Sequence, residues 1–234
     1  MEETAPTLSP EEARRHYQAN ADKQDAQAWY EDEAFRVLIA CSDFALANDV
    51  LEAGCGTGRL AEMLLRDHLP SNARYTGIDI APAMLARAGK RLARFAPQVT
   101  LKPGDVTLGL TAGAATVDRV IATYLFDLLS PAHSRNLIGE FHRILRPDGL
   151  LCLTSLAPET SDGDTTILTQ IWRLVQRRWP WAVGGCRPVE LRPLLDDTLW
   201  KLVAHETVSP RGLTSEILVA RKVRSDGTDG NHQH

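Results

Sequence analysis

The sequence predicts an α/β fold, a doubly wound and mostly parallel sheet with helices on both faces. The first observation is a strand, a glycine-rich turn and a helix in succession between residues 49 and 68. The second is that strand patterns alternate with helix patterns as far as residue 153, as parallel strands require. The third is a pair of alternating segments, 199–208 and 213–223, joined by too few residues for a helix. They therefore form an antiparallel hairpin.

The composition suits one α/β domain with a modest accessory part. The chain has 234 residues, of which 44% are hydrophobic and 24% charged, and its formal net charge of −4 offers no basic field to nucleic acid. The four cysteines are far apart and contain no C-x-x-C pair, which argues against zinc and disulfides and suits a reducing compartment. No secretory signal or membrane span is recognisable. We therefore expect a cytoplasmic protein without a metal site.

Residues 1–47 are predicted to form a helical leader. Ser9 is a helix N-cap followed by proline and acidic residues, and apolar positions at helical spacing continue in two pieces. Such a leader packs on the sheet edge or over a ligand pocket. In the second case Tyr17, Trp29 and Tyr30 would close the site; the alternative is plain packing.

The segment 49–59 is the most informative part of the chain. Val50 and Leu51 are the buried end of a strand, and a glycine turn leads from there into a helix over 60–68. A dinucleotide fingerprint, G-x-G-x-x-G/A, requires a small residue at the position that Arg59 occupies. The observed G-x-G-x-G spacing therefore argues against a nicotinamide cofactor.

The second strand pattern, residues 74–80, places an acid beside the glycine turn. Asp79 stands at the carboxyl end of this strand, where a carboxylate can accept hydrogen bonds from both hydroxyls of a ribose. Nicotinamide-binding domains use an acid in the same way, so Asp79 alone does not decide which nucleoside cofactor is bound.

The next elements follow in order. Residues 98–106 form a short strand with a Pro-Gly-Asp turn, and residues 116–123 form a strand through the sheet centre. Ser130 caps a helix that continues to about Leu145, and residues 145–153 form a turn and a buried strand.

Three stretches together resemble one known family. They are the glycine turn with Glu52 before it, the run G-I-D-I-A-P-A-M-L at 77–85, and L-R-P-D-G at 145–149. They are similar to motifs of the class I S-adenosylmethionine (SAM)-dependent methyltransferases, in the style of the small-molecule enzymes of ubiquinone and menaquinone biosynthesis. Ala81 replaces the usual serine, which removes a helix cap, and Asp148 replaces the first glycine of a turn.

The resemblance implies a Rossmann-like seven-stranded sheet that binds SAM and releases S-adenosylhomocysteine (SAH). It implies that Asp105 accepts from the adenine amino group and that the Val106 N–H bonds a ring nitrogen. Thr123 and Tyr124 would line the methionine part and the transferring methyl. The predicted cofactor-binding residues are Tyr17, Glu52, Gly54, Cys55, Gly56, Gly58, Asp79, Ile80, Met84, Asp105, Val106, Thr123 and Tyr124.

The domain spans residues 48–223, followed by a tail, 224–234, predicted to be disordered. Within the domain, the segment 155–195 corresponds to an insertion that covers the substrate in this family. It is rich in aromatic residues and carries the arginines Arg173, Arg177, Arg178, Arg187 and Arg192. This composition suits an amphiphilic or anionic substrate or peripheral contact with a membrane, or else an ordinary amphipathic helix with a solvated basic face.

No catalytic residue is assigned. A sulfonium methyl is already activated, so the protein must chiefly hold a nucleophile in line with it. The weak candidates for a general base are His16, Asp127, His133 and Glu159, each of which is also explained as a cap, a surface group or a satisfied polar residue.

The resemblance implies a SAM-dependent methyltransferase (EC 2.1.1.-) that acts on a small molecule, such as a lipid-like, quinone-like or natural-product acceptor. The protein would be a monomer or a homodimer. The sequence has no N-P-P-Y run, which also argues against nucleic-acid substrates. Three alternatives stay open: a catalytically silent SAM-binding protein, another transferase on the SAM-binding core, such as an aminopropyl transferase, and an NAD-dependent oxidoreductase.

Overall fold

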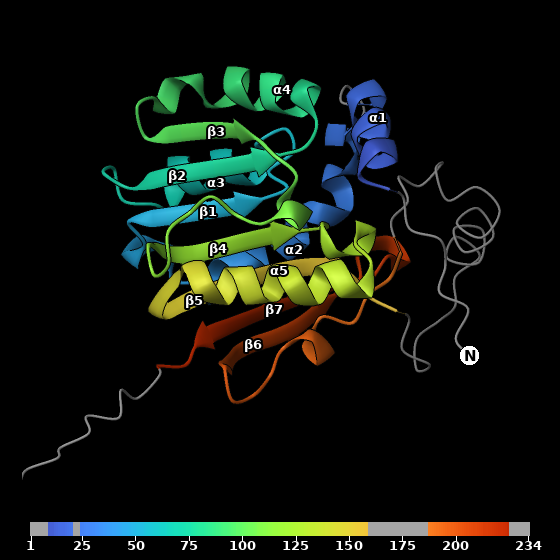
Figure 1. Ribbon diagram of the computed structural model, residues 1–234. Coiled ribbons are helices and arrows are strands. Elements are labelled where there is room, and N and C mark those ends of the chain that lie inside the picture. The colour runs from blue at the N-terminus through green and yellow to red at the C-terminus, as the bar shows by residue number, and fades with distance from the viewer. Residues whose placement is uncertain (1–8, 21–23, 159–186, 225–234) are drawn as a thin grey trace, which may run out of the picture.

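The computed structural model describes residues 9–20, 24–158 and 187–224. They form a seven-stranded sheet with strand order β3-β2-β1-β4-β5-β7-β6 (Figure 1). The strands are β1 Asp49–Ala53, β2 Arg74–Asp79, β3 Val99–Pro103, β4 Val117–Thr123, β5 Leu145–Leu156, β6 Trp200–Val208 and β7 Ser215–Lys222. The predicted fold class is confirmed.

The first five strands are parallel, and β7 pairs antiparallel with both β5 and β6. The hairpin expected at the end of the chain is therefore present. It puts one reversed strand, β7, between β5 and β6. The chain leaves β1 toward β2 and β3 on one side and later fills the other side from β4 onward. The junction of β1 and β4 is thus the point at which doubly wound sheets bind ligands.

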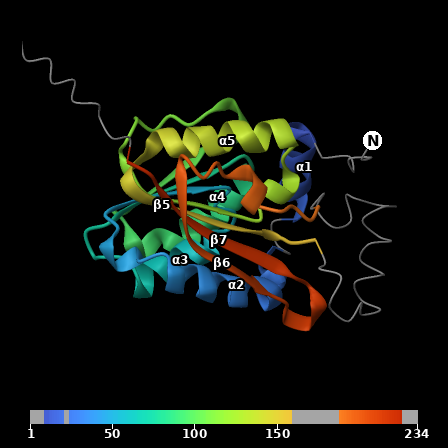
Figure 2. The ribbon, with the colours of Figure 1, turned by 90° about the horizontal axis from the view of Figure 1, so that it is seen from below.

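Helices cover both faces of the sheet, as Figure 2 shows, with α5 on one face and α2 and α3 on the other. The main helices are α1 Pro10–Asn20, α2 Ala28–Cys41, α3 Arg59–Asp67, α4 Pro82–Leu92 and α5 Pro131–Ile144. Short 3-10 turns connect several elements: η1 Gln24–Gln27, η4 Val106–Leu108, η5 Phe126–Leu128, η7 Arg192–Leu194 and η8 Pro210–Gly212. The helical leader thus consists of α1, η1 and α2.

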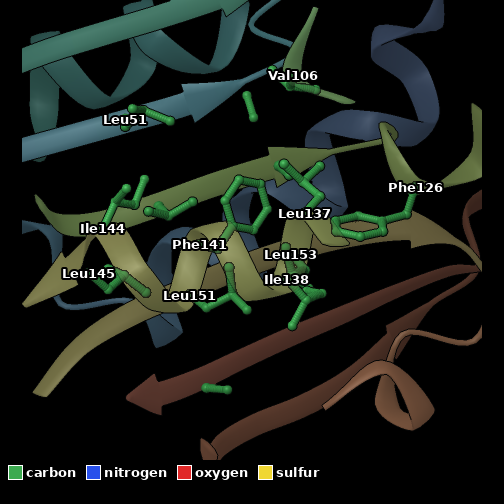
Figure 3. Close-up of a cluster of buried hydrophobic side chains, with 14 of the residues drawn as sticks. Leu51, Val106, Phe126, Leu137, Ile138, Phe141, Ile144, Leu145, Leu151 and Leu153 are labelled. Atoms are coloured by element: carbon green, nitrogen blue, oxygen red, sulfur yellow. The ribbon is translucent and has the colours of Figure 1, made fainter. Parts of the chain in front are cut away.

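Two hydrophobic cores form because the central strands are buried on both faces. In β4, Val120 points into the core under α5, whereas the next residue, Ile121, points into the core under α2 and α3. Figure 3 shows the first core, where Phe141 of α5 packs edge-on against Phe126 with ring centroids 6.3 Å apart. Phe126 has no exposed surface and is part of this core.

The turn predicted before β5 is a bulge in the strand itself. Val117 pairs with Leu145, but Arg119 already pairs with Leu150, so residues 146–149 are looped out. Asp148 adopts a φ of 64°, a left-handed conformation that aspartate tolerates better than most residues. None of the described helices is long and apolar enough to cross a membrane.

Close contact of β2 with the turn after β1 and with a side chain of β3 leaves no room for a side chain at Gly77. A Cβ there would lie 2.8 Å from Cys55 Sγ and 3.0 Å from Leu101 Cδ2. We expect Gly77→Ala to destabilise the protein by about 1–3 kcal/mol through overpacking, measured by urea unfolding.

Gly139 provides the matched control. It lies exposed in α5, and a Cβ at this position would meet no atom within 4 Å. Gly139→Ala should stabilise the protein by about 0.5–1 kcal/mol, because alanine loses less backbone entropy in a helix. Equal effects of the two substitutions would contradict this description of the packing.

Candidate functional site

A cavity of about 380 Å³ opens at the carboxyl ends of β1, β2 and β4, and residues of the helical leader also line it. In Figure 1, α1 lies beyond these strand ends. Twelve of the thirteen residues predicted to bind the cofactor line this cavity: Tyr17, Glu52, Gly54, Cys55, Gly56, Asp79, Ile80, Met84, Asp105, Val106, Thr123 and Tyr124. The sequence motifs therefore converge on one site.

The glycine turn is fixed by hydrogen bonds to β2. The backbone N–H groups of Gly54 and Cys55 both donate to the carbonyl of Ile78, at 2.8 and 3.0 Å. The N–H of Gly56 donates to Asp79 Oδ2 at 2.8 Å. Gly56 has a φ of 51°, and a Cβ on it would meet no protein atom within 4 Å, so its backbone faces open space. Such a surface allows a ligand to approach the main chain closely.

Gly58 is the exception among the predicted residues, because it is absent from the described lining of the cavity. It is the N-cap of α3, with a φ of 75°. A Cβ there would lie 3.1 Å from Leu92 Cδ1 and 3.2 Å from Ala88 Cβ. Its place in the structure is therefore explained by the packing of the glycine turn against α4.

Asp79 joins two backbone segments around the cavity. Its Oδ2 accepts from Gly56, and its Oδ1 accepts from the N–H of Ala81 at 2.8 Å. Burial raises the pKa of Asp79, whereas these two hydrogen bonds act in the opposite direction. Each carboxylate oxygen has a further lone pair, so Asp79 retains the capacity to accept hydrogen bonds from a ligand.

Glu52 is a buried acid in the wall of the cavity, with 2% of its surface exposed. The hydroxyl of Tyr75, which is fully buried, donates to its carboxylate. Burial, together with the charge of the neighbouring Asp79, raises the pKa of Glu52 to about 8, although the hydrogen bond from Tyr75 acts to lower it.

The remaining predicted residues come from η4 and the end of β4. Asp105 caps η4, because its Oδ1 accepts from the N–H of Thr107 at 2.9 Å. Tyr124 has a φ of 52° at the strand end, and its hydroxyl lies 2.9 Å from that of Ser215 in β7. Its ring meets Tyr30 edge-on at 5.4 Å, which connects the leader to the sheet. The third aromatic residue expected to close the site, Trp29, is 40% exposed and is not among the described lining residues.

Arg59, which the sequence marked only as an obstacle to a dinucleotide, lines the cavity and anchors the leader. Its guanidinium donates to Glu31 at 2.6 Å and to Asp32, both in α2, and lies 5.0 Å from the centroid of the Phe35 ring. Nearby, Arg91 of α4 pairs with Asp25 of η1. Sequence reasoning missed Asp25, Glu31 and Asp32; only the high density of acidic residues in this part of the leader signalled them.

The candidates for a general base differ in whether they line the cavity. Asp127 and His133 line the cavity, whereas His16 is absent from its described lining, and Glu159 lies outside the described residues. Asp127 has no exposed surface, and burial raises its pKa to about 7. The described part of the chain has no group of three His, Cys, Asp or Glu side chains placed to hold a metal ion.

Most of the predicted cap, including Arg173, Arg177 and Arg178, lies outside the described residues. The two arginines that are described have partners within the protein. Arg187 donates to the carbonyl of Leu129 at 2.6 Å, and Arg192 forms an ion pair with Asp197. Neither is among the described residues that line the cavity, so these two do not support the expectation of a cationic substrate cover.

Comparison with known proteins gives a consistent result. Residues 50–149 match a family model described as a methyltransferase domain. A malonyl-[acyl-carrier protein] O-methyltransferase from Paenibacillus sp. (strain JDR-2) is 33% identical over 113 residues, which are 47% of this chain and 40% of that protein. The match thus spans less than half the length of this relative.

Two solved structures resemble almost the whole chain. The N-methyltransferase NodS from Bradyrhizobium japonicum WM9, in complex with SAH, has a TM-score of 0.70 at 18% identity, covering 91% of this chain and 99% of that one. The [4+2]-cyclase SpnF has a TM-score of 0.71 at 18% identity, covering 94% and 98%. At this level of identity the likeness establishes the fold, and the second structure shows that the fold also serves other chemistry.

The pKa of Glu52 predicts a pH dependence of stability. The pKa of Glu52 is about 8 in the folded protein, above its ordinary value of 4.5. Between pH 4.5 and pH 8 the Glu52 carboxyl therefore keeps its proton in the folded protein but loses it in the unfolded chain. The contribution of the Glu52 carboxyl to the free energy of unfolding is fully present below its pKa in the unfolded chain, and it is lost as the pH rises to 8. We expect Glu52→Gln to remove this loss, which amounts to at most about 1.4 kcal/mol per pH unit.

Urea unfolding between pH 5 and pH 8 measures the effect. Glu206→Gln, at an exposed position on the edge strand β6, should keep the pH dependence of the wild type. A Glu52→Gln variant whose stability falls with pH as steeply as that of the wild type would refute the assignment to Glu52.

Proposed function

We propose that this chain is a class I SAM-dependent methyltransferase and that it transfers a methyl group from SAM to a small-molecule acceptor. The observation that carries the proposal is the hydrogen bond between Gly56 and Asp79. It brings a glycine backbone with free space beside it to the same cavity as an acid that can bind the hydroxyls of a ribose. The acceptor would be lipid-like, quinone-like or a natural product, in keeping with the acyl-carrier-protein relative.

The residues present fit SAM. Gly56 leaves space next to its backbone, and the lining acids complement a cofactor that carries a sulfonium and an ammonium. Asp79 would accept hydrogen bonds from the ribose hydroxyls, and Asp105 and Val106 would hold the adenine. Thr123 and Tyr124, at the end of β4, would line the methionine part. SAM supplies the methyl group: a lone pair of the acceptor forms the new bond to carbon while the C–S pair stays on sulfur, which gives SAH.

The contribution of the protein would be mainly positional. The glycine turn, Asp79 and the η4 segment are held by backbone hydrogen bonds, so they would fix the cofactor with little reorganisation. The leader covers the cavity through Arg59, which α2 holds, and would exclude water from the reacting atoms. Alignment of two reactants in this way can contribute about 7–11 kcal/mol to the reduction of a barrier.

An NAD-dependent oxidoreductase is disfavoured by the same geometry. Arg59 occupies the position where a dinucleotide fold needs a small residue against the pyrophosphate, and its side chain is bonded to Glu31 and Asp32.

The proposal is tested by ligand binding. Calorimetry should show micromolar affinity for SAM or SAH and none for NAD. Asp79→Ala should weaken SAM binding about 10- to 100-fold, because it removes the hydrogen bonds of a charged group to the ribose. Circular dichroism would confirm that the variant is folded.

Asp67→Asn, at an exposed position in α3, is the matched control and should bind SAM like the wild type. Transfer of label from methyl-labelled SAM into small molecules of a cell extract would then identify the acceptor. Binding of NAD without binding of SAM would reverse the assignment.

A further inference from the structure

The start of α4 lacks a side-chain cap from its own N-cap residue. That position is Ala81, which makes no side-chain hydrogen bond to the helix, and Pro82 follows it. A serine at the N-cap would accept a hydrogen bond from one of the first N–H groups of the helix, which have no partner inside the helix. In α4 these donors need partners from another part of the chain or from water.

Gln18 in α1 is such a partner. Its Oε1 accepts from the backbone N–H of Ala83, the second residue of α4, at 2.9 Å. The two residues are 65 positions apart in the sequence, and Figure 1 shows α1 beside one end of α4. The helical leader thus provides the cap that the side chain of Ala81 cannot provide.

The capped end of α4 also belongs to the proposed cofactor site. The N–H of Ala81 donates to Asp79, the acid proposed to bind the ribose, and Met84 lines the cavity. Tyr17 of α1 lines the cavity as well and packs against Ala81 and Met84. Two consecutive residues of α1, Tyr17 and Gln18, therefore attach it to the start of α4, one by apolar packing and the other by a hydrogen bond.

The apolar face of α1 borders the cavity. Pro10, Ala13 and Tyr17 follow helical spacing, so they lie on one face of the helix, and all three line the cavity. The structure describes the whole of α1, and none of its residues is buried. The hydrophobic effect therefore holds this helix weakly while the cavity is open, and a ligand that fills the cavity would cover the apolar face.

We propose that Gln18 is a positioning residue for the cofactor. Its hydrogen bond to α4 holds α1 in place, so that Tyr17 and the apolar face of α1 cover the bound cofactor. Gln18 is not among the described residues that line the cavity, so it acts through α1. This inference rests on the proposed function, because it takes SAM or SAH as the ligand that fills the cavity.

The first test measures the affinity of the full-length protein for SAH by calorimetry. Gln18→Ala removes the acceptor, and alanine preserves the helical preference of α1. We expect about three- to tenfold weaker binding, because one helix cap changes an equilibrium by about fivefold. Gln18→Glu keeps an oxygen acceptor at the same distance from the backbone and should bind SAH within about twofold of the wild type.

Arg15→Ala is the matched control. Arg15 lies at an exposed position of the same helix and is not among the described residues that line the cavity. This variant should bind SAH like the wild type. Equal weakening by Arg15→Ala and Gln18→Ala would show that any change in α1 has this effect, which would overturn the specific role of Gln18.

A further substitution separates positioning of α1 from capping of α4 alone. Ala81→Ser gives α4 a cap of its own. Added to Gln18→Ala, it should restore the free energy of unfolding measured in urea but leave the affinity for SAH reduced, because the serine does not hold α1. Recovery of the wild-type affinity in the double variant would contradict the positioning role.

Trypsin provides a direct readout of the attachment of α1. It cleaves after Arg14 and Arg15, and cleavage there requires local opening of the helix. Saturating SAH should slow cleavage of these two bonds in the wild type, with mass spectrometry identifying the products. Gln18→Ala should be cleaved there several-fold faster than the wild type, and Gln18→Glu at the wild-type rate.

The outcomes separate the two proposals. If the wild type does not bind SAH, the proposed function fails and this inference fails with it. If the wild type binds SAH, but Gln18→Ala binds it as tightly or leaves the cleavage of α1 unchanged, only the role of Gln18 is refuted. Gln18 is exposed, so the comparison of Gln18→Ala with Gln18→Glu decides the matter even if Ala81→Ser disturbs the fold.

Discussion

The site depends on the hydrogen bond between the Gly56 backbone and the Asp79 carboxylate. This bond joins the turn after β1 to the end of β2, and the bonds from Gly54 and Cys55 to Ile78 strengthen the same junction. Because these contacts lie at the carboxyl ends of neighbouring parallel strands, the sheet itself sets the geometry of the turn. The two glycines at this junction have different roles. The absence of a side chain at Gly56 leaves space for a ligand, and its absence at Gly77 allows the turn to pack on β2.

A second constraint is the attachment of the leader. The helix α1 has no buried residue, so apolar burial alone holds it weakly. The helix α2, by contrast, buries Ala34, Phe35 and Leu38 in the second core. Charged pairs on either side of the glycine turn add to this attachment: Arg59 with Glu31 and Asp32, and Arg91 with Asp25. The pairs of Arg59 with Asp32 and of Arg91 with Asp25 are partly exposed and contribute modestly to stability, whereas the pair of Arg59 with Glu31 is largely buried.

The sequence was most informative where backbone geometry restricts residue type. Alternate glycines and an acid at a strand end are required by local conformation, so the turn and Asp79 could be predicted from spacing. The role of Gly58 could not, because its close neighbours, Ala88 and Leu92, come from a helix 30 residues further along the chain. The acids of the leader were missed as site residues for the same reason: their importance follows from burial and from distant partners such as Arg59.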